Sequence, residues 1–466
     1  MFFVPFEERV VLQIGIDFGT THTTAAFFDG QQIDFVPLDA ANKDSHLLRS
    51  LLYITRSHES IMGVEAAQAY LRDNTGRLAR IVQKKVGTIE NTVARVSRGP
   101  LEPDGPIVIV YDVHIEEDVG APGRLIQSIK TGLRDPEYPG TTVFERFFTV
   151  EELVALLLAH VREKATAHLR APVTGAVIGR PVNFAATPEA DKLAEARLRR
   201  AAGLAGFNDV TFMLEPVAAA LFYIRRQAKP QTLLVFDFGG GTLDLTLMRS
   251  HGAGRAPDVL ATGGVLVGGD DFDSALMRRP VAPYFGAGST IDREGHPMPA
   301  YLISKLYHWQ TIPELSRAKH LPTIRQARQF GNNPVAFAAL ETLALKNYGF
   351  ALFEKIEQAK RTLSSSPQTH LEMEAEAIHL SLPITRQAFQ AAIMDEVAAV
   401  QAGISAVLQQ GGVAAADVDV VVTTGGSSLV PIFQQILRRR FPASNIVHSD
   451  TFGSAAAGLA ICAFSS

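Results

Sequence analysis

Short apolar runs and longer amphipathic segments follow one another through the first half of the chain. A short apolar run bounded by turn residues is typical of a strand, and apolar residues three or four positions apart are typical of a helix. Leu153, Leu157 and Val161, with Leu156 and His160 beside them, recur at the helical spacing. We expect strands at residues 11–17, 23–29, 33–38, 107–113 and 175–179, and a long helix at residues 151–169.

The second half shows the same alternation. Its patterns predict a hairpin at residues 232–248, strands near 258–262 and 418–424, and helices at 348–363, 385–409, 430–441 and 453–464. Strands that alternate with helices form sheets whose faces are covered by helices. The sequence therefore predicts an α/β fold.

One short segment occurs twice in the chain. Residues 14–21 are Ile-Gly-Ile-Asp-Phe-Gly-Thr-Thr, and residues 235–242 are Val-Phe-Asp-Phe-Gly-Gly-Gly-Thr. Each copy is an apolar strand that ends in Asp-Phe, followed by a glycine-containing turn and a second strand. Because the copies lie about 220 residues apart, we expect two related lobes at residues 11–214 and 215–466.

Two segments differ from this alternating pattern. Residues 56–106 mix charge, glycine and proline around a helical stretch at 65–72, and residues 279–346 contain seven prolines and the single tryptophan, Trp309. We expect both to be surface insertions within the lobes, and the second to be long enough for a small helical subdomain.

Composition excludes several classes of protein. The 466 residues correspond to about three domains, and a hydrophobic share of 47% is that of a globular protein. The net charge of −4 gives no reason to expect nucleic acid or a membrane as partner. One cysteine, Cys462, permits neither an internal disulfide nor a CxxC metal site. The first ten residues do not resemble a signal peptide and no apolar run reaches membrane-spanning length, so we expect a cytoplasmic protein.

The two glycine-containing turns have the chemistry of a phosphate and metal site. Glycines let backbone N–H groups approach an anion closely, and threonine hydroxyls add donors. Asp17 and Asp237, at the ends of their strands, are the carboxylates that hydrated Mg²⁺ prefers. Either turn alone is as well explained as an ordinary hairpin turn, but the matched pair favours a phosphate clamp. There is no Gly-Lys dipeptide and therefore no P-loop.

With these turns the sequence resembles the nucleotide-binding domain of the DnaK-type heat shock protein 70 family, within the actin-like ATPase superfamily. The match extends in the family's order from residue 14 to about residue 464, and Lys-Arg-Thr-Leu-Ser-Ser-Ser at residues 360–366 is its most specific part. The resemblance implies two related lobes, each with a mixed sheet flanked by helices, and ATP or ADP with Mg²⁺ in the cleft between them. The other matching segments are residues 177–181, 215–220, 268–273 and 424–427.

The resemblance also implies roles for individual residues. Asp17 and Asp237 would bind Mg²⁺ through water, Glu215 would place or activate the attacking water, and Thr242 and Asp244 would lie beside the γ-phosphate. The residues that would bind the phosphates and the rest of the nucleotide are Thr20, Thr21, Gly239, Gly240, Gly241, Thr242, Gly268, Gly269 and Ser427.

The adenosine pocket would be formed by one helix face and one glycine turn. Glu357, Lys360, Arg361 and Ser364 have the i, i+3, i+4, i+7 spacing of one helix face. A solvated charged stripe would explain the Glu–Lys pairing but not the three serines that follow. On the other side, Gly425 and Gly426 would approach the adenine.

The family's catalytic lysine is best matched by Lys130, with Lys84 and Lys85 as competing candidates. Two residues after Ser427 the family has an arginine, where this chain has Leu429, which implies weaker adenosine binding. The family's proline switch matches Pro181, but its partner arginine has no clear counterpart near Glu195 and Arg197.

We expect a Mg²⁺-dependent ATP-binding protein that hydrolyses ATP slowly as a conformational switch, with protein partners binding through the insertions. The match reaches almost to Ser466, so a peptide-binding domain is not expected, and the chain most resembles the short bacterial YegD-type proteins. Two alternatives stay open: a small-molecule kinase of the same superfamily, and a nucleotide-binding scaffold without turnover. The sequence does not indicate an oligomeric state.

Two further residue types, histidine and arginine, suggest no additional site. His22, next to the first turn, is expected to be an outward polar residue, and the 13 histidines show no metal-ligand spacing. Residues 438–440, three arginines, are expected to lie in the last turn of a helix, where the helix dipole favours cations.

Overall fold

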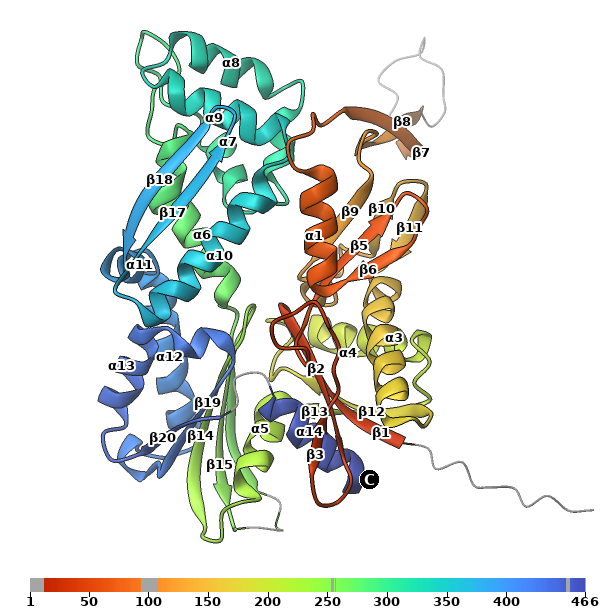
Figure 1. The fold of residues 1–466 in the computed structure, drawn as a ribbon, viewed down its shortest axis with the longest axis vertical. Coiled ribbons are helices and arrows are strands. Elements are labelled where there is room, and N and C mark those ends of the chain that lie inside the picture. The colour runs from red at the N-terminus through yellow and green to blue at the C-terminus, as the bar shows by residue number, and fades with distance from the viewer. Residues whose placement is uncertain (1–11, 94–106, 253–254, 256, 450–452, 466) are drawn as a thin grey trace, which may run out of the picture.

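The protein, seen in a computed structural model, has two lobes that lie side by side (Figure 1). The structure describes residues 12–93, 107–252, 255, 257–449 and 453–465. The first residue of the predicted strand at 11–17, the stretch before it and residues 94–106 of the first predicted insertion lie outside the described residues.

The sheet of lobe I is mixed, with strand order β13-β12-β1-β2-β3, and β4 also pairs with β2. β1 is antiparallel to β2 and parallel to β12, so the predicted hairpin lies in the middle of the sheet. The strands are β1 (Leu12–Phe18), β2 (His22–Phe28), β3 (Ile33–Phe35), β4 (Leu48–Arg49), β12 (Val173–Arg180) and β13 (Asp209–Leu214).

The sheet of lobe II repeats this plan, with strand order β16-β15-β14-β19-β20. β14 is antiparallel to β15 and parallel to β19, as β1 is to β2 and β12. The repeated sequence segment thus reflects a repeated sheet, and the predicted α/β fold class is confirmed. The strands are β14 (Gln231–Phe238), β15 (Leu243–Ser250), β16 (Asp258–Val265), β19 (Val420–Thr424) and β20 (Asn445–His448).

Helices cover both sheets. Leu153, Leu157 and Val161 of α3 are fully buried in one core cluster with strand residues such as Ile14 and Ile178, as the helical spacing predicts. α4 packs beside α3, and α12 packs on β15 and β16. The helices that cover the sheets are α3 (Val150–Leu169), α4 (Pro188–Leu204), α5 (Glu215–Ile224), α12 (Met394–Gln410), α13 (Pro431–Arg440) and α14 (Ser454–Ser465).

The C-terminal helix α14 does not follow the predicted division at residue 215. It packs against β1, β2 and β12 of lobe I and against α5, and Figure 1 shows it returning beneath the lobe I sheet. The reason is its composition: Ala456, Ala457 and Ala460 let it approach the strands closely. α5 contacts β14 and β15 of lobe II as well as β12 and β13, so α5 and α14 together join the two sheets.

In each lobe a long segment is inserted at the same place. It lies between the third strand (β3 or β16) and the strand that runs parallel to the first (β12 beside β1, or β19 beside β14). In lobe I this segment contains β5 (Leu51–Thr55), β6 (Ser60–Met62), α1 (Gly63–Asn74), β7 (Ile81–Val93), β8 (Ile107–Asp118), β9 (Gly123–Gln127), α2 (Ile129–Gly132), β10 (Gly140–Val143) and β11 (Arg146–Thr149). In lobe II it contains α6 (Gly269–Leu276), α7 (Ala300–Ile303), α8 (Leu321–Phe330), α9 (Pro334–Leu345), α10 (Gly349–Ser365), β17 (Gln368–Ala375), β18 (Ile378–Thr385) and α11 (Arg386–Ala392).

The predicted surface insertion at residues 56–106 is partly a core element. Its helix α1 contributes Ala66, Ala69 and Tyr70 to a hydrophobic cluster that also contains Trp309 and Phe350 of lobe II. The Tyr70 ring lies 5.8 Å from the Trp309 ring and 5.3 Å from the Phe350 ring, between centroids. This segment therefore joins the lobes, whereas residues 279–346 form mainly helical structure.

The helix predicted at residues 385–409 is two helices, α11 and α12, at an angle of 67°. The helical pattern continues through the break, so the amino-acid sequence alone did not indicate it; the backbone of Ile393 leaves the helical region, with φ −105° and ψ 22°. Within the described residues, no single helix has the length and apolar character to cross a membrane, and only this bent pair meets those two criteria jointly.

The close packing of α14 can be tested at Gly458. A Cβ atom there would lie 1.8 Å from the carbonyl oxygen of Ala218 on α5, so the two helices would have to move apart. We expect Gly458→Ala to lower the free energy of unfolding by about 1–3 kcal/mol or more, measured by urea unfolding.

A matched control is Gly203→Ala on α4, where a Cβ atom would meet nothing within 4 Å. Because alanine is the better helix former, this variant is expected to gain about 0.5–1 kcal/mol. Equal unfolding midpoints for the two variants would contradict the packing argument.

Candidate functional site

A cleft between the lobes is lined by the two repeated turns. Each turn is closed in the same way: the Gly19 N–H donates to the His22 carbonyl at 2.9 Å, and the Gly239 N–H donates to the Thr242 carbonyl at 3.0 Å. The turns approach each other so closely that a Cβ atom on Gly240 would lie 2.3 Å from Thr21 Cγ2. The two predicted phosphate loops therefore face each other across the cleft.

Four carboxylates converge at the floor of this cleft. Asp17 is the next-to-last residue of β1 and Asp237 is the next-to-last residue of β14, where it is directly opposite Asp244 of β15. Glu215 is the first residue of α5. Glu215 and Asp244 are buried, whereas Asp17 and Asp237 open onto the cleft.

Burial and mutual repulsion raise the pKa values of the three aspartates among these acids. Burial is the larger cause and the charge of Glu215 the second: together they raise the pKa of Asp244 to about 7 and that of Asp237 well above its usual range. The pKa of Asp17 is raised by the same two causes and lowered by the nearby Lys130 ammonium. The site therefore has an excess of negative charge that its own residues do not neutralise.

Lys130 is the cation among these carboxylates. It lies on the four-residue helix α2, is buried, and its Nζ lies 2.7 Å from Glu215 Oε1. Burial alone would lower the pKa of Lys130, but Glu215 and Asp17 outweigh burial and raise it. The side chains of the competing Lys84 and Lys85 lie outside the part of the chain that the structure describes.

Asp244 is fixed by hydrogen bonds on both of its oxygens. Oδ2 accepts from Thr242 Oγ1 at 3.0 Å, and Oδ1 accepts from the Val182 N–H at 2.7 Å. Val182 follows Pro181 at the end of β12, so the lobe I sheet contacts the acid of lobe II directly.

The predicted adenosine face lines the outer part of the cleft. Glu357, Lys360, Arg361 and Ser364 of α10 all border it, opposite Gly425, Gly426 and Ser427. Lys360 Nζ lies 2.7 Å from Asp273 Oδ2 and donates to the Gly269 carbonyl at 2.9 Å. Gly425 has the positive φ of 78° that favours glycine.

Among the predicted site residues, only Gly268 does not line the cleft. It lies behind the second turn, where a Cβ atom would be 2.2 Å from the Gly240 carbonyl oxygen. Leu429 lies nearby with 43% of its surface exposed, and no arginine takes its place among the residues that line the cleft on that side.

The structure adds residues that sequence reasoning missed. Arg49 lines the cleft and donates from both terminal nitrogens to Glu354 of α10, at 2.9 and 2.7 Å. No signal indicated this pair, whose members are 305 residues apart. Asp270 and Asp273 also line the cleft; they lie in the matching segment 268–273, which had indicated only its glycines.

His22 is not the outward residue that was expected. It lines the cleft, and its Nδ1 lies 3.2 Å from Thr21 Oγ1. Burial lowers the pKa of His22 to about 4, so the imidazole is neutral near pH 7.

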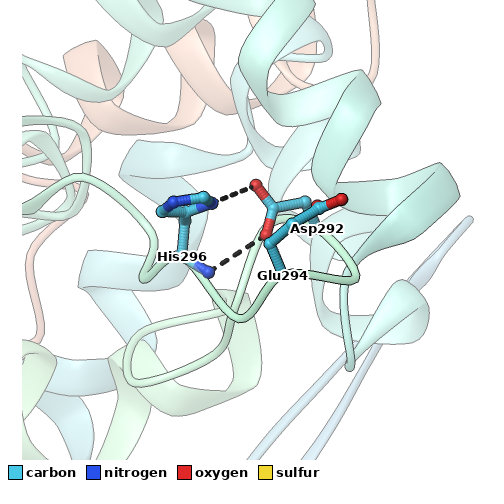
Figure 2. A group of neighbouring side chains, drawn as sticks. All are labelled: Asp292, Glu294 and His296. Carbon is cyan, nitrogen blue, oxygen red and sulfur yellow. Dashed lines mark hydrogen bonds and ion pairs between the residues drawn. The ribbon is translucent and has the colours of Figure 1, made fainter.

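A second group of polar residues lies outside the cleft, on the loop between the short helix Ala282–Phe285 and α7. Asp292, Glu294 and His296 are close together there (Figure 2). Among the described residues, they are the one group of three or more histidine, cysteine or acidic side chains whose ligand atoms lie close enough to share a metal ion. The sequence had suggested no such cluster. Asp292 Oδ1 accepts from the His296 N–H at 3.0 Å and Oδ2 lies 2.8 Å from His296 Nδ1, which explains their proximity as loop closure.

Comparison with known proteins gives two findings. A model of the Hsp70 protein family matches residues 129–305 and 346–463, more than half of the chain. The chain is also 26% identical over 433 residues to the Heat shock 70 kDa protein BIP3 of Oryza sativa subsp. japonica. That alignment covers 92% of this chain and 52% of the rice protein, so the chain spans about half the length of this relative.

The buried carboxylates predict a dependence of stability on pH. The pKa of Asp244 rises from 3.8 to about 7 on folding, so between these values the folded state binds more protons than the unfolded state. The free energy of unfolding therefore falls as pH rises through this window. We expect the free energy of unfolding of Asp244→Asn to fall less steeply with rising pH than that of wild type, in urea unfolding measured from about pH 4 to pH 8. Parallel profiles would contradict the assignment, and Asp395→Asn, at an exposed site on α12, is the matched control.

Proposed function

Because the chain belongs to the Hsp70 family, we propose that it binds ATP with Mg²⁺ in the cleft between its lobes and hydrolyses it slowly as a conformational switch. One observation is the main support: two matched turns face each other directly above four carboxylates that share one lysine. The proposal concerns the activity of this cleft alone.

The donor set fits a hard divalent cation. Mg²⁺ keeps several waters and binds one or two carboxylates together with substrate phosphates. Asp17 and Asp237, which open onto the cleft, would bind it through water. Burial and the charge of Glu215 raise the pKa of each, and a cation beside them would favour their charged forms. Bound Mg²⁺ would supply charge neutralisation for the phosphates.

The backbone of the two turns suits phosphate oxygens. Thr20 and Thr21 of lobe I and residues 239–242 of lobe II supply N–H and hydroxyl donors from opposite sides. Donors fixed before the ligand arrives stabilise developing charge without reorganisation. The nucleoside would extend along α10, between Glu357, Lys360, Arg361 and Ser364 on one side and residues 425–427 on the other.

Glu215 and Lys130 would act on the reacting groups. Glu215 is the carboxylate that would orient the attacking water and accept its proton, and Lys130 would contact the phosphoryl oxygens. In the structure the two are hydrogen-bonded at 2.7 Å, so the lysine fixes the carboxylate in the cleft. Thr242 and Asp244 would orient the γ-phosphate beside them.

One observation favours a second candidate, a nucleotide-binding scaffold without turnover. Leu429 provides no cation to stack on adenine, which would cost about 0.5–2 kcal/mol of binding. The further proposals from the sequence are a likeness to the YegD-type proteins, a cytoplasmic location and protein partners that bind through the inserted segments.

Binding can be tested by thermal unfolding. A ligand that binds only the folded state adds about 2.7 kcal/mol of stability at 100 times its Kd, so millimolar Mg-ATP is expected to raise the Tm of wild type. Asp17→Asn and Thr242→Val are expected to show a smaller rise, and Thr369→Val, on β17 outside the cleft, an unchanged one. No rise for wild type would refute the proposed function.

Turnover can be tested at Glu215. We expect Glu215→Gln to bind Mg-ATP with the wild-type Kd in calorimetry but to release phosphate at least about 100-fold more slowly. Equal turnover in the variant would remove Glu215 from its role. Phosphate release by wild type that requires an added sugar or polyol would instead support the kinase alternative.

A further inference from the structure

The short helix that bears Lys130 is attached to both lobes. Its C-terminal end is anchored within lobe I by Arg197 of α4, whose guanidinium is partly buried. One nitrogen of this group, Nη1, donates to the carbonyl oxygens of Gly132, Leu133 and Asp135 at 3.2, 3.3 and 2.8 Å.

The N-terminal end of the same helix is attached to lobe II. Two consecutive residues contact it: Trp309 Nε1 donates to Gln127 Oε1 at 2.6 Å, and Ser128 Oγ donates to Asp270 Oδ2 at 3.0 Å. Asp270 in turn donates its backbone N–H to the Gly240 carbonyl at 2.9 Å. Ser128 is thus linked, through Asp270, to the turn of lobe II at residues 239–242.

Ser128 also has an unusual backbone. Its φ of 55° and ψ of 33° lie in the left-handed region, which is unfavourable for residues other than glycine and persists where surrounding contacts fix it. This residue comes directly before α2, and Lys130 is two residues further on. The chain leaves β9 at Gln127, so its direction from there to Lys130 depends on the backbone conformation of Ser128.

We propose that Ser128 is a positioning residue, which, through its hydrogen bond to Asp270, places Lys130 beside Glu215 only when the two lobes are closed. The inference rests on the proposed function for its effect on turnover. When the lobes separate, the Arg197 contacts within lobe I remain but both contacts to lobe II are lost, so the lysine is no longer fixed from its N-terminal side.

The first test compares turnover with binding. Ser128→Gly removes the hydroxyl but suits the left-handed backbone, so it separates the hydrogen bond from the backbone conformation. We expect kcat for ATP hydrolysis to fall about tenfold while the Kd for Mg-ATP changes less than about twofold. An unchanged kcat in a chain whose wild type turns over ATP would overturn the proposal.

The second test asks whether Ser128 acts through Asp270. In a double-mutant cycle with Asp270→Ala, residues that act through one shared bond give non-additive effects on kcat. We expect Asp270→Ala to lower kcat much less in the Ser128→Gly background than in wild type, and additive effects would overturn the proposal. Arg170→Gly, at an exposed left-handed position that ends α3, is the matched control and is expected to leave kcat unchanged.

The third test does not depend on turnover. The N–H groups of Thr131 and Leu133 donate within the α2 turn, at 3.0 and 3.2 Å. We expect both Ser128→Gly and Asp270→Ala to speed hydrogen exchange at these amides, and Arg170→Gly to leave it unchanged. Unchanged exchange in Asp270→Ala would overturn the inference, whereas faster exchange in a protein that does not hydrolyse ATP would contradict only the proposed function.

Discussion

The main constraint on this fold is the gathering of four carboxylates, two of them buried, around one ammonium. Asp17 and Asp237 lie near the ends of equivalent strands, Asp244 is opposite Asp237, and Glu215 begins the helix that joins the sheets. Their mutual repulsion opposes folding, and the apolar cores of both lobes offset it. A site built in this way is short of positive charge, so the same residues that weaken the free protein would suit the cation and phosphates of the proposed function.

The two lobes are alike in their sheets and differ in what is inserted into them. The matched strands supply the matched parts of the site: the two turns and the two strand-end aspartates. The parts without a counterpart come from the inserted segments, since Lys130 lies on α2 of lobe I and the adenosine face lies on α10 of lobe II. The two sheets are therefore alike, but the inserted segments place different groups at the two ends of the cleft.

Local sequence predicted the parts of the site that are local in structure. The turns, the strand-end acids and the face of α10 each depend on residues within about one hairpin or helix, so their patterns are visible in the sequence. Arg49, Gln127 and Ser128 depend on partners more than 140 residues away, and a single sequence does not show such pairs. The break at Ile393 and the return of α14 to lobe I are missed for the same reason: packing between distant segments decides them.

The contacts between the lobes differ in kind at the two ends of the cleft. At the lower end, α5 and α14 pack so closely that a Cβ atom on Gly458 would lie 1.8 Å from the Ala218 carbonyl oxygen, and separating them would expose fully buried alanines. At the upper end the described contacts include side-chain pairs, Arg49 with Glu354 and Tyr70 with Trp309, and two backbone hydrogen bonds, from the N–H groups of Gly76 and Ala79 to the carbonyls of Lys346 and Leu345. Hydrogen bonds and ion pairs at the upper end can be replaced by bonds to water, whereas separating α5 from α14 would expose buried alanines, so we expect the lobes to separate more easily above the cleft than below it. A ligand bound at the floor therefore acts where the lobes are most firmly joined, and its effect on closure reaches the upper end through the few residues, Ser128 among them, that cross between the lobes.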